Sequence, residues 1–159
     1  MSDSTHVPPD DDKLRRQGLL LSHEFSRLEG RQPRVLVGKS IKVSQEVMRS
    51  VCSVFADMGF NVDIAPANSS VDDLALQCVE NDADILFVLG ANHMTLTQLT
   101  NLANKLAFYK LETVKALDFQ APLSLMDAKK LDELYRIFPE DANPAETSLR
   151  LLKILLTKS

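Results

Sequence analysis

Apolar residues recur along this chain in two patterns, short continuous runs and longer stretches with helical spacing. Two runs are continuous, Val-Leu-Val within Arg34–Gly38 and Ile-Leu-Phe-Val-Leu within Asp84–Leu89. Such short apolar runs are typical of strands in a parallel sheet that is covered on both faces. We therefore predict strands over both segments, with 84–89 at the centre of the sheet.

Between these runs, apolar residues three and four positions apart predict amphipathic helices. The predicted helices are Lys13–Glu29, Val43–Met58, one capped by Ser70 with Asp73 in a capping-box position, Thr95–Tyr109, Leu125–Leu134, and a last helix with Asn143 as cap and Pro144 at its first position. The remaining predicted strands are Asn61–Ile64, Glu112–Asp118 and a short edge strand at Arg136–Phe138.

The alternation of strands and helices predicts an α/β fold. We expect a doubly wound, flavodoxin-like (Rossmann-like) five-stranded parallel sheet with helices on both faces and an extra N-terminal helix. Residues 1–11 read as a disordered acidic tail, 12–33 as the N-terminal helix and a linker, and 34–159 as the α/β domain. Ligands of such sheets bind at the carboxyl ends of the strands, which here are the loops after Val37, Ile64 and Leu89.

Composition and charge exclude several classes of function. The net charge of -4 gives no electrostatic reason to expect nucleic-acid binding. No apolar run approaches the roughly 20 residues that a membrane-spanning helix needs. The N-terminus has neither a secretory signal nor an Arg-rich transit peptide, so we expect a cytoplasmic protein. The two cysteines, Cys52 and Cys78, fall on predicted helices without metal-site spacing, and we expect them to be buried.

The loop from Lys39 to Gln45 is the clearest candidate for ligand contact. Its lysines and hydroxyls stand at the carboxyl end of the first strand, and the following helix start offers backbone N–H groups to an anion such as phosphate. Lys39, Lys42 and Ser44 are the possible anion-binding residues, and a solvated loop is the alternative. Gly38-Lys39-Ser40 ends like a phosphate-binding P-loop, but Pro33 stands where that motif needs its first glycine.

Other polar residues have structural explanations. His93 is expected near a helix start with Asn92 as cap, and His23 on the solvated side of the first helix. The acidic pairs Asp72-Asp73 and Asp82/Asp84 match helix starts and turns. No catalytic set of nucleophile and base emerges from the sequence, and no metal site is expected.

Residues from about Leu21 to Leu106 resemble the C-terminal cobalamin-binding domain of methylmalonyl-CoA mutase. The resemblance is carried by E-G-R-Q-P-R-V-L-V-G-K (29–39), F-A-D-M-G-F-N-V-D-I-A-P (55–66), A-L-Q-C-V-E-N-D-A-D-I (75–85) and H-M-T-L-T-Q-L (93–99). It implies that 34–159 is a cobalamin-binding-like domain.

The resemblance also implies a metal-ligand loop, which this sequence does not reproduce. The family binds cobalamin through an Asp-x-His-x-x-Gly loop after the first strand, in which the His coordinates cobalt. Counted back from Phe55, the motif positions are Lys42, Ser44 and Val47; counted forward from Lys39, they are Val43, Gln45 and Met48. A Ser-x-Leu of the family's third strand becomes Phe87-Val88-Leu89, and no glycine follows Gly90.

Two hypotheses follow. The first is a non-catalytic protein with a degenerate cobalamin-binding fold and no expected cofactor, at most a non-catalytic subunit of a cobalamin-dependent isomerase. Its partner would be a mutase large subunit or a second copy of the chain. The alternative is a small-molecule binding module that uses the loop after the first strand for phosphate, a nucleotide or cobalamin without a His ligand.

Overall fold

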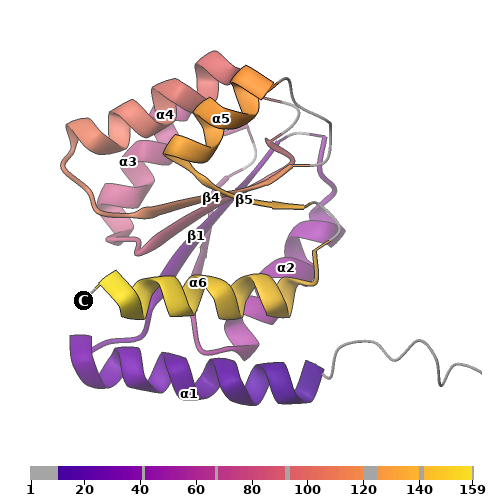
Figure 1. Cartoon of the computed structure of the whole chain (residues 1–159), viewed down its shortest axis with the longest axis vertical. Helices are drawn as coiled ribbons and strands as arrows, with labels where there is room; N and C mark the ends of the chain where they lie inside the picture. Colours follow the sequence, from indigo (N-terminus) through magenta and orange to yellow (C-terminus); the bar gives the residue numbers. More distant parts are fainter. Residues whose placement is uncertain are drawn as a thin grey trace, which may run out of the picture.

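A five-stranded, fully parallel sheet forms the centre of the molecule (Figure 1). The computed structural model describes residues 11–40, 42–66, 68–91, 94–119, 125–139 and 142–158. The strands are β1 (Arg34–Lys39), β2 (Asn61–Ile64), β3 (Ile85–Leu89), β4 (Val114–Phe119) and β5 (Arg136–Pro139). Their order, β2-β1-β3-β4-β5, is the flavodoxin-like order that the sequence predicts.

Helices cover both faces of the sheet, and α1 adds a further layer (Figure 1). The helices are α1 (Asp11–Glu29), α2 (Gln45–Asp57), α3 (Val71–Asn81), α4 (Leu96–Phe108), α5 (Leu125–Leu134) and α6 (Pro144–Lys158). One core cluster joins the sheet to α2 and α6, and a second joins it to α3, α4 and α5. Helix α1 lies along α6 on the outer side of the first face (Figure 1).

The predicted helices and strands are confirmed, with small shifts at their ends. Helix α1 begins at Asp11 rather than Lys13, inside the predicted tail, because acidic residues in its first turn favour the helix dipole; the rest of that tail lies outside the described residues. Helix α2 begins at Gln45 rather than Val43 because the Ser44 hydroxyl accepts a hydrogen bond from the Val47 N–H.

Side-chain caps start the other helices where the sequence places them. Ser70 and Asp73 form a reciprocal capping box at α3, as predicted, and Thr95 with Gln98 forms another at α4. The Asn143 side chain accepts the Ala145 N–H at 2.8 Å, so α6 starts at Pro144 as predicted. The cap predicted at Asn92 lies outside the described residues.

The outer helix α1 is held in place by a close approach of its backbone to the end of α2, and not by its leucines alone. Gly18, Ser22 and Phe25 are its buried residues, and the Ser22 hydroxyl donates to the Met58 carbonyl. An added Cβ on Gly18 would lie 2.3 Å from the Met58 Cε. Leu28 follows the buried Phe25 at helical spacing, which predicts that it lies on the same apolar face, but it is 48% exposed. Small residues at the contact decide which face of α1 is buried.

Aromatic rings and cysteines fill the core around β3, all five of whose residues are buried. Phe87 meets Phe55 and Phe138 edge to face, with ring centroids 5.7 and 6.3 Å apart. Cys52 and Cys78 are buried, as predicted. The sheet is therefore a rigid floor for the loops at its ends.

Candidate functional site

A cavity of about 450 Å³ lies at the carboxyl ends of the strands, on the face covered by α2 and α6. Its lining comes from the start of α2, the ends of β3, β4 and β5, and the start of α6: Lys42, Val43, Ser44, Val47, Val51, Phe87, Leu89, Gly90, Asp118, Phe138, Pro139, Ala142, Pro144 and Thr147. The volume falls within the roughly 300–1,000 Å³ typical of small-molecule sites. We call this the switch-point cavity, because the chain continues from β1 toward one edge of the sheet, at β2, and from β3 toward the other edge, at β4 and β5.

The loop after β1 is held against β3 by its own hydrogen bonds. The Ser40 N–H donates to the Leu89 carbonyl at 3.0 Å, and the Lys42 N–H donates to the Ser40 hydroxyl at 3.2 Å. Val43 N–H closes a turn on the Ser40 carbonyl at 3.0 Å. These bonds bring the start of α2 to the edge of the switch-point cavity.

The three predicted anion-binding residues divide between two places. Lys42 and Ser44 line the switch-point cavity. Lys39 ends β1, pairs in register with Leu89, and is not among the cavity-lining residues. The structure therefore brings one cation and one hydroxyl of the predicted set together at the cavity.

The floor of the cavity is apolar apart from one carboxylate. Phe87 is 4% exposed and Phe138 is 2% exposed. Asp118, 9% exposed, lies one residue before the end of β4 on the same face, and its carboxylate accepts the Gly90 N–H. Thr147 of α6 is 4% exposed and also lines the cavity.

Sequence reasoning missed Asp118 and Thr147. Asp118 ends a predicted strand, and polar residues at the carboxyl ends of parallel strands meet at one edge of the sheet, so a signal for it was present. No sequence pattern pointed to Thr147, because it reaches the cavity only through the packing of α6 over β5.

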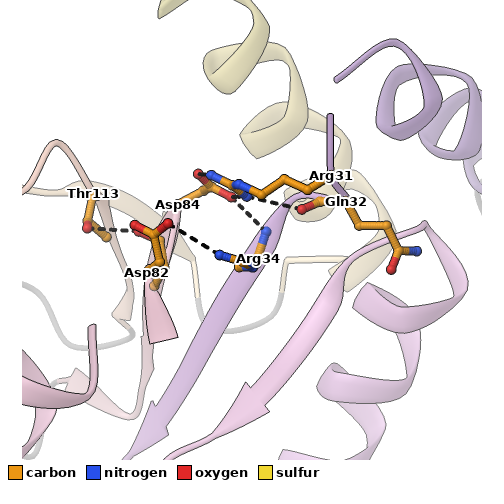
Figure 2. A network of polar contacts seen from close by, with 7 residues as sticks. Arg31, Gln32, Arg34, Asp82, Asp84 and Thr113 are labelled. Carbon is orange, nitrogen blue, oxygen red and sulfur yellow. Dashed lines mark hydrogen bonds and ion pairs between the residues drawn. The ribbon is translucent and has the colours of Figure 1, made fainter. Parts of the chain in front are cut away.

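A second polar site lies at the amino ends of the strands, at the opposite end of the sheet from the switch-point cavity (Figure 2). Asp84 accepts two bonds from the Arg31 guanidinium, at 2.7 and 2.8 Å, and a third from the Arg34 N–H at 2.8 Å. The hydrogen bond to Asp84 raises the pKa of Arg31. Arg34 reaches Asp82 at 3.3 Å, and the Thr113 hydroxyl donates to the Ala83 carbonyl at 2.9 Å.

This network ties the chain together at the amino ends of the strands. Asp82 is the left-handed C-cap of α3, with φ 52°, which agrees with its predicted turn role. Asp84 does more than the predicted turn chemistry, because it anchors the linker before β1. A cavity of about 380 Å³ adjoins the network, but its charged side chains include this satisfied ion pair.

The other sequence candidates fall in structural places. Gly38 lies within β1, where an added Cβ would meet Leu74 at 3.0 Å, so Gly38-Lys39-Ser40 is strand and turn rather than a phosphate loop. His23 is exposed on α1, as predicted. His93 lies outside the described residues.

The described ranges hold neither a cluster of metal ligands nor a membrane-spanning helix. Among those residues, no group of three or more His, Cys, Asp or Glu side chains lies close enough to hold a metal ion. None of the described helices is long and apolar enough to cross a membrane.

Comparison with known proteins relates part of this chain to methylmalonyl-CoA mutases. The chain is 37% identical over 79 residues to the methylmalonyl-CoA mutase large subunit of Porphyromonas gingivalis, an alignment that covers 48% of this chain and 11% of that protein. It is 40% identical over 75 residues to the large subunit of Streptomyces virginiae, covering 45% of this chain and 10% of that protein. The chain thus spans about a tenth of the length of these relatives. No protein-family model matches it.

Solved structures share the fold. A cobalamin-binding protein from Desulfitobacterium hafniense matches with a TM-score of 0.61 at 14% identity, over 96% of this chain and 73% of that one. The chemotaxis protein CheY4 of Vibrio cholerae matches with a TM-score of 0.58 at 14% identity, over 77% of this chain and 98% of that one.

Together these findings define the class of the protein. The chain has a flavodoxin-like fold and a distant, partial similarity to the cobalamin-binding region of methylmalonyl-CoA mutase.

Proposed function

We propose that this chain is a non-catalytic, cobalamin-domain-like protein that assists a methylmalonyl-CoA mutase-type isomerase and holds no cobalamin through a histidine. One observation carries the proposal. Counted back from Phe55, the position that the resemblance assigns to the cobalt ligand holds Ser44, whose hydroxyl accepts the Val47 N–H as the cap of α2. Counted forward from Lys39, that position holds Gln45, so neither count supplies a histidine. A serine hydroxyl is a poor cobalt ligand. Lys42, at the position of the family's Asp, supplies no carboxylate that could orient a ligand to the metal.

The packing of the sheet supports the same conclusion. Phe87 stands where the resemblance implies a small residue, and its ring packs edge to face on Phe55 and Phe138. These rings occupy space beneath the switch-point cavity that a cofactor tail would need. The residues present therefore do not fit a family-like, histidine-ligated cobalamin.

The proposed assisting role rests on the contrast between a retained framework and an altered ligand loop. The resemblance carried by residues 29–39, 55–66, 75–85 and 93–99 includes β1, β2 and the start of β3, while the ligand loop after β1 is rewritten. A retained framework beside an altered ligand loop fits a protein that has kept the shape and the contacts of the domain. The partner in this proposal is a mutase large subunit, with a second copy of the chain as the other outcome of the test.

Two measurements test the proposal. Mixing the chain with hydroxocobalamin should leave the cobalamin absorption spectrum unchanged, whereas a cobalamin-binding mutase in parallel should change it. Size-exclusion chromatography with the mutase large subunit from the same host should show co-elution. A chain that runs as a monomer beside that subunit, or one that acquires a bound-corrin spectrum, would contradict the proposal.

A second function is favoured by a separate observation, the switch-point cavity itself. We propose as this alternative that the chain binds a small molecule there, with Lys42 and Ser44 at the rim. The start of α2 adds backbone N–H groups and a positive dipole end. A thermal-shift screen with nucleotides, acyl-CoA and cobalamins tests it. Binding should weaken in Lys42→Met and not in Lys39→Met, the matched lysine outside the cavity.

A further inference from the structure

Helices α3 and α4 expose an apolar stripe on the face of the molecule away from α1, α2 and α6 (Figure 1). Leu76 and Val79 of α3 are 48% and 40% exposed. Phe108 and Tyr109, at the end of α4, are 69% and 43% exposed. These four are among the nine large hydrophobic residues exposed in the described part of the chain, so exposed apolar surface is concentrated here. We call the four residues the α3–α4 stripe.

The two helices are aligned so that the four side chains lie on neighbouring turns. Both helices return the chain from the carboxyl ends to the amino ends of parallel strands, so they run in the same direction. An ion pair of 3.5 Å between the Asp72 carboxylate and the Lys105 ammonium fixes which turns face each other. One turn further on, Leu76 follows Asp72 by four positions and Phe108 follows Lys105 by three. Phe108 also borders the same surface groove as Asp72 and Lys105.

We infer that the α3–α4 stripe is the contact between two copies of this chain, related by a twofold axis that passes between Leu76 and Phe108. The axis is perpendicular to the helices, so α3 of each copy lies over α4 of the other and runs in the opposite direction. This interface goes beyond both proposed functions and depends on neither, because the switch-point cavity lies on the other face of the sheet, beneath α2 and α6.

The charges beside the stripe favour a second copy as the occupant. A twofold interface has to be complementary to itself. Helix α3 carries Asp72, Asp73 and Glu80 but no Lys or Arg. Lys105 is the only charged residue of α4, and Lys110 lies two positions beyond its end. The acidic helix of one copy therefore meets the basic helix of the other. In this arrangement Glu80 approaches Lys105 of the second copy, and Asp72 approaches Lys110 of the second copy.

The aromatic pair provides the central contact surface. The Phe108 and Tyr109 rings stack with centroids 5.6 Å apart and planes 13° apart. The pair is thus ordered before association and loses little conformational freedom on contact. Buried aromatic residues near the centre of an interface carry most of its binding energy. The two helices are only about 16 and 20 Å long. The contact area is therefore small, and we expect a weak dimer with a Kd of about 10–100 µM.

Sedimentation velocity of the full chain tests the interface at concentrations from about 1 µM to about 1 mM. The native chain should pass from monomer to dimer in this range, and added salt should weaken the dimer because it screens the charges beside the stripe. Phe108→Ser should raise the Kd at least about tenfold. Leu20→Ser is the matched control, since Leu20 is 72% exposed on α1, on the other side of the molecule, and it should leave the Kd unchanged.

Both replaced side chains are exposed, so both variants should keep the native fold, which thermal melts check. A native chain that is monomeric throughout this range would overturn the interface. Equal effects of Phe108→Ser and Leu20→Ser would overturn it as well, because the contact would then lie elsewhere.

Exchanged charges test how the two copies are arranged. Lys105→Glu places a carboxylate opposite Glu80 of the second copy, and Glu80→Lys places an ammonium group opposite Lys105 of the second copy. Each variant by itself should dimerise about 3- to 10-fold more weakly than the native chain. An equimolar mixture of the two variants should dimerise about as tightly as the native chain, because every contact again joins opposite charges. A mixture as weak as the separate variants would overturn the twofold arrangement.

These experiments use neither the mutase large subunit nor a ligand of the switch-point cavity. A failure to dimerise therefore overturns this interface and neither of the proposed functions, which are measured by co-elution with the mutase subunit and by ligand binding. Conversely, Phe108→Ser should leave any Lys42-dependent ligand binding unchanged, because Lys42 lies at the cavity on the other face of the sheet.

Discussion

At the residue scale, Asp84 shows how one carboxylate joins three segments. It stands directly before β3 and accepts hydrogen bonds from the Arg31 side chain in the linker and from the Arg34 N–H at the start of β1 (Figure 2). Its side chain is 15% exposed and that of Arg31 is 28% exposed, so water competes weakly for the pair. A bidentate, part-buried ion pair of this kind is stronger than an ordinary surface pair.

Replacing Asp84 with Asn should lower the free energy of unfolding by about 1–3 kcal/mol, because the charge-assisted bonds to Arg31 are lost. Urea denaturation measures this. Asp82→Asn is the matched control, since that carboxylate is 72% exposed and its contact with Arg34 is longer. The control should stay within about 0.5 kcal/mol of the native chain. Equal losses in both variants would contradict the assigned role.

Burial of Cys78 makes a prediction about pH. Desolvation raises the pKa of this thiol from 9.0 to about 12. Between these values the folded state holds a proton that the unfolded state has lost, so stability falls as pH rises, by about 1.4 kcal/mol per pH unit from this group. Below pH 9 the thiol is protonated in both states and has no effect on how the free energy of unfolding changes with pH.

The comparison of native chain with Cys78→Ala isolates that effect. The native chain should be the more stable at pH 7, because Cys78 fills a fully buried site. Its advantage should shrink on approach to pH 11 as the thiol contribution is lost. Tyr135, whose pKa burial also raises, contributes to both proteins alike. A stability difference that is constant from pH 7 to pH 11, measured by urea titration, would contradict the prediction.

At the scale of the element, the position of α1 depends on the turn after α2. Gly59 has φ +97°, and a Cβ added there would lie 2.5 Å from the Ser22 Cβ. Gly30, which follows α1, also has a positive φ, of +79°, but nothing lies within 4 Å of its added Cβ. The two glycines therefore share a backbone conformation and differ in whether another helix approaches them.

Gly59→Ala should destabilise the protein by about 2–4 kcal/mol, from left-handed strain together with the clash against α1. Gly30→Ala should cost about 1 kcal/mol, from strain alone. Thermal or urea unfolding of both variants checks the difference. Costs of the same size would mean that the approach of α1 to this turn contributes nothing.

At the scale of the whole molecule, the sheet order decides which parts are held most firmly. β1, β3 and β4 are paired on both sides, while β2 and β5 are edge strands. The two core clusters meet across β3, whose residues alternate between them. The molecule should therefore open from its edges inward.

Hydrogen exchange monitored residue by residue tests this order. Amides of Leu36, Val37, Leu86 and Phe87 should exchange most slowly, near the rate set by global unfolding. Amides of β2 and β5 should exchange faster, through local opening. Protection in β5 equal to that in β3 would contradict the expected hierarchy.

Much of this architecture was accessible from the sequence, for local reasons. Continuous apolar runs identified β1 and β3, helical spacing identified the helices, and Ser70, Asn143 and Pro144 marked their starts. These signals depend on neighbours within a few residues, so they survive without knowledge of the fold. The ends of β4 and the buried face of α1 were less well predicted, because partners distant in sequence determine them.

The chain by itself therefore determined the elements, their order in the sheet and the residues Lys42 and Ser44 of the loop after β1. Only the tertiary structure placed Asp118 and Thr147 with them in one cavity, excluded Lys39 from its lining, and paired Arg31 with Asp84. The physical reason is separation along the chain. Periodicity and capping act over a few residues, whereas these contacts join positions that only the packing of α2 and α6 on the sheet brings together.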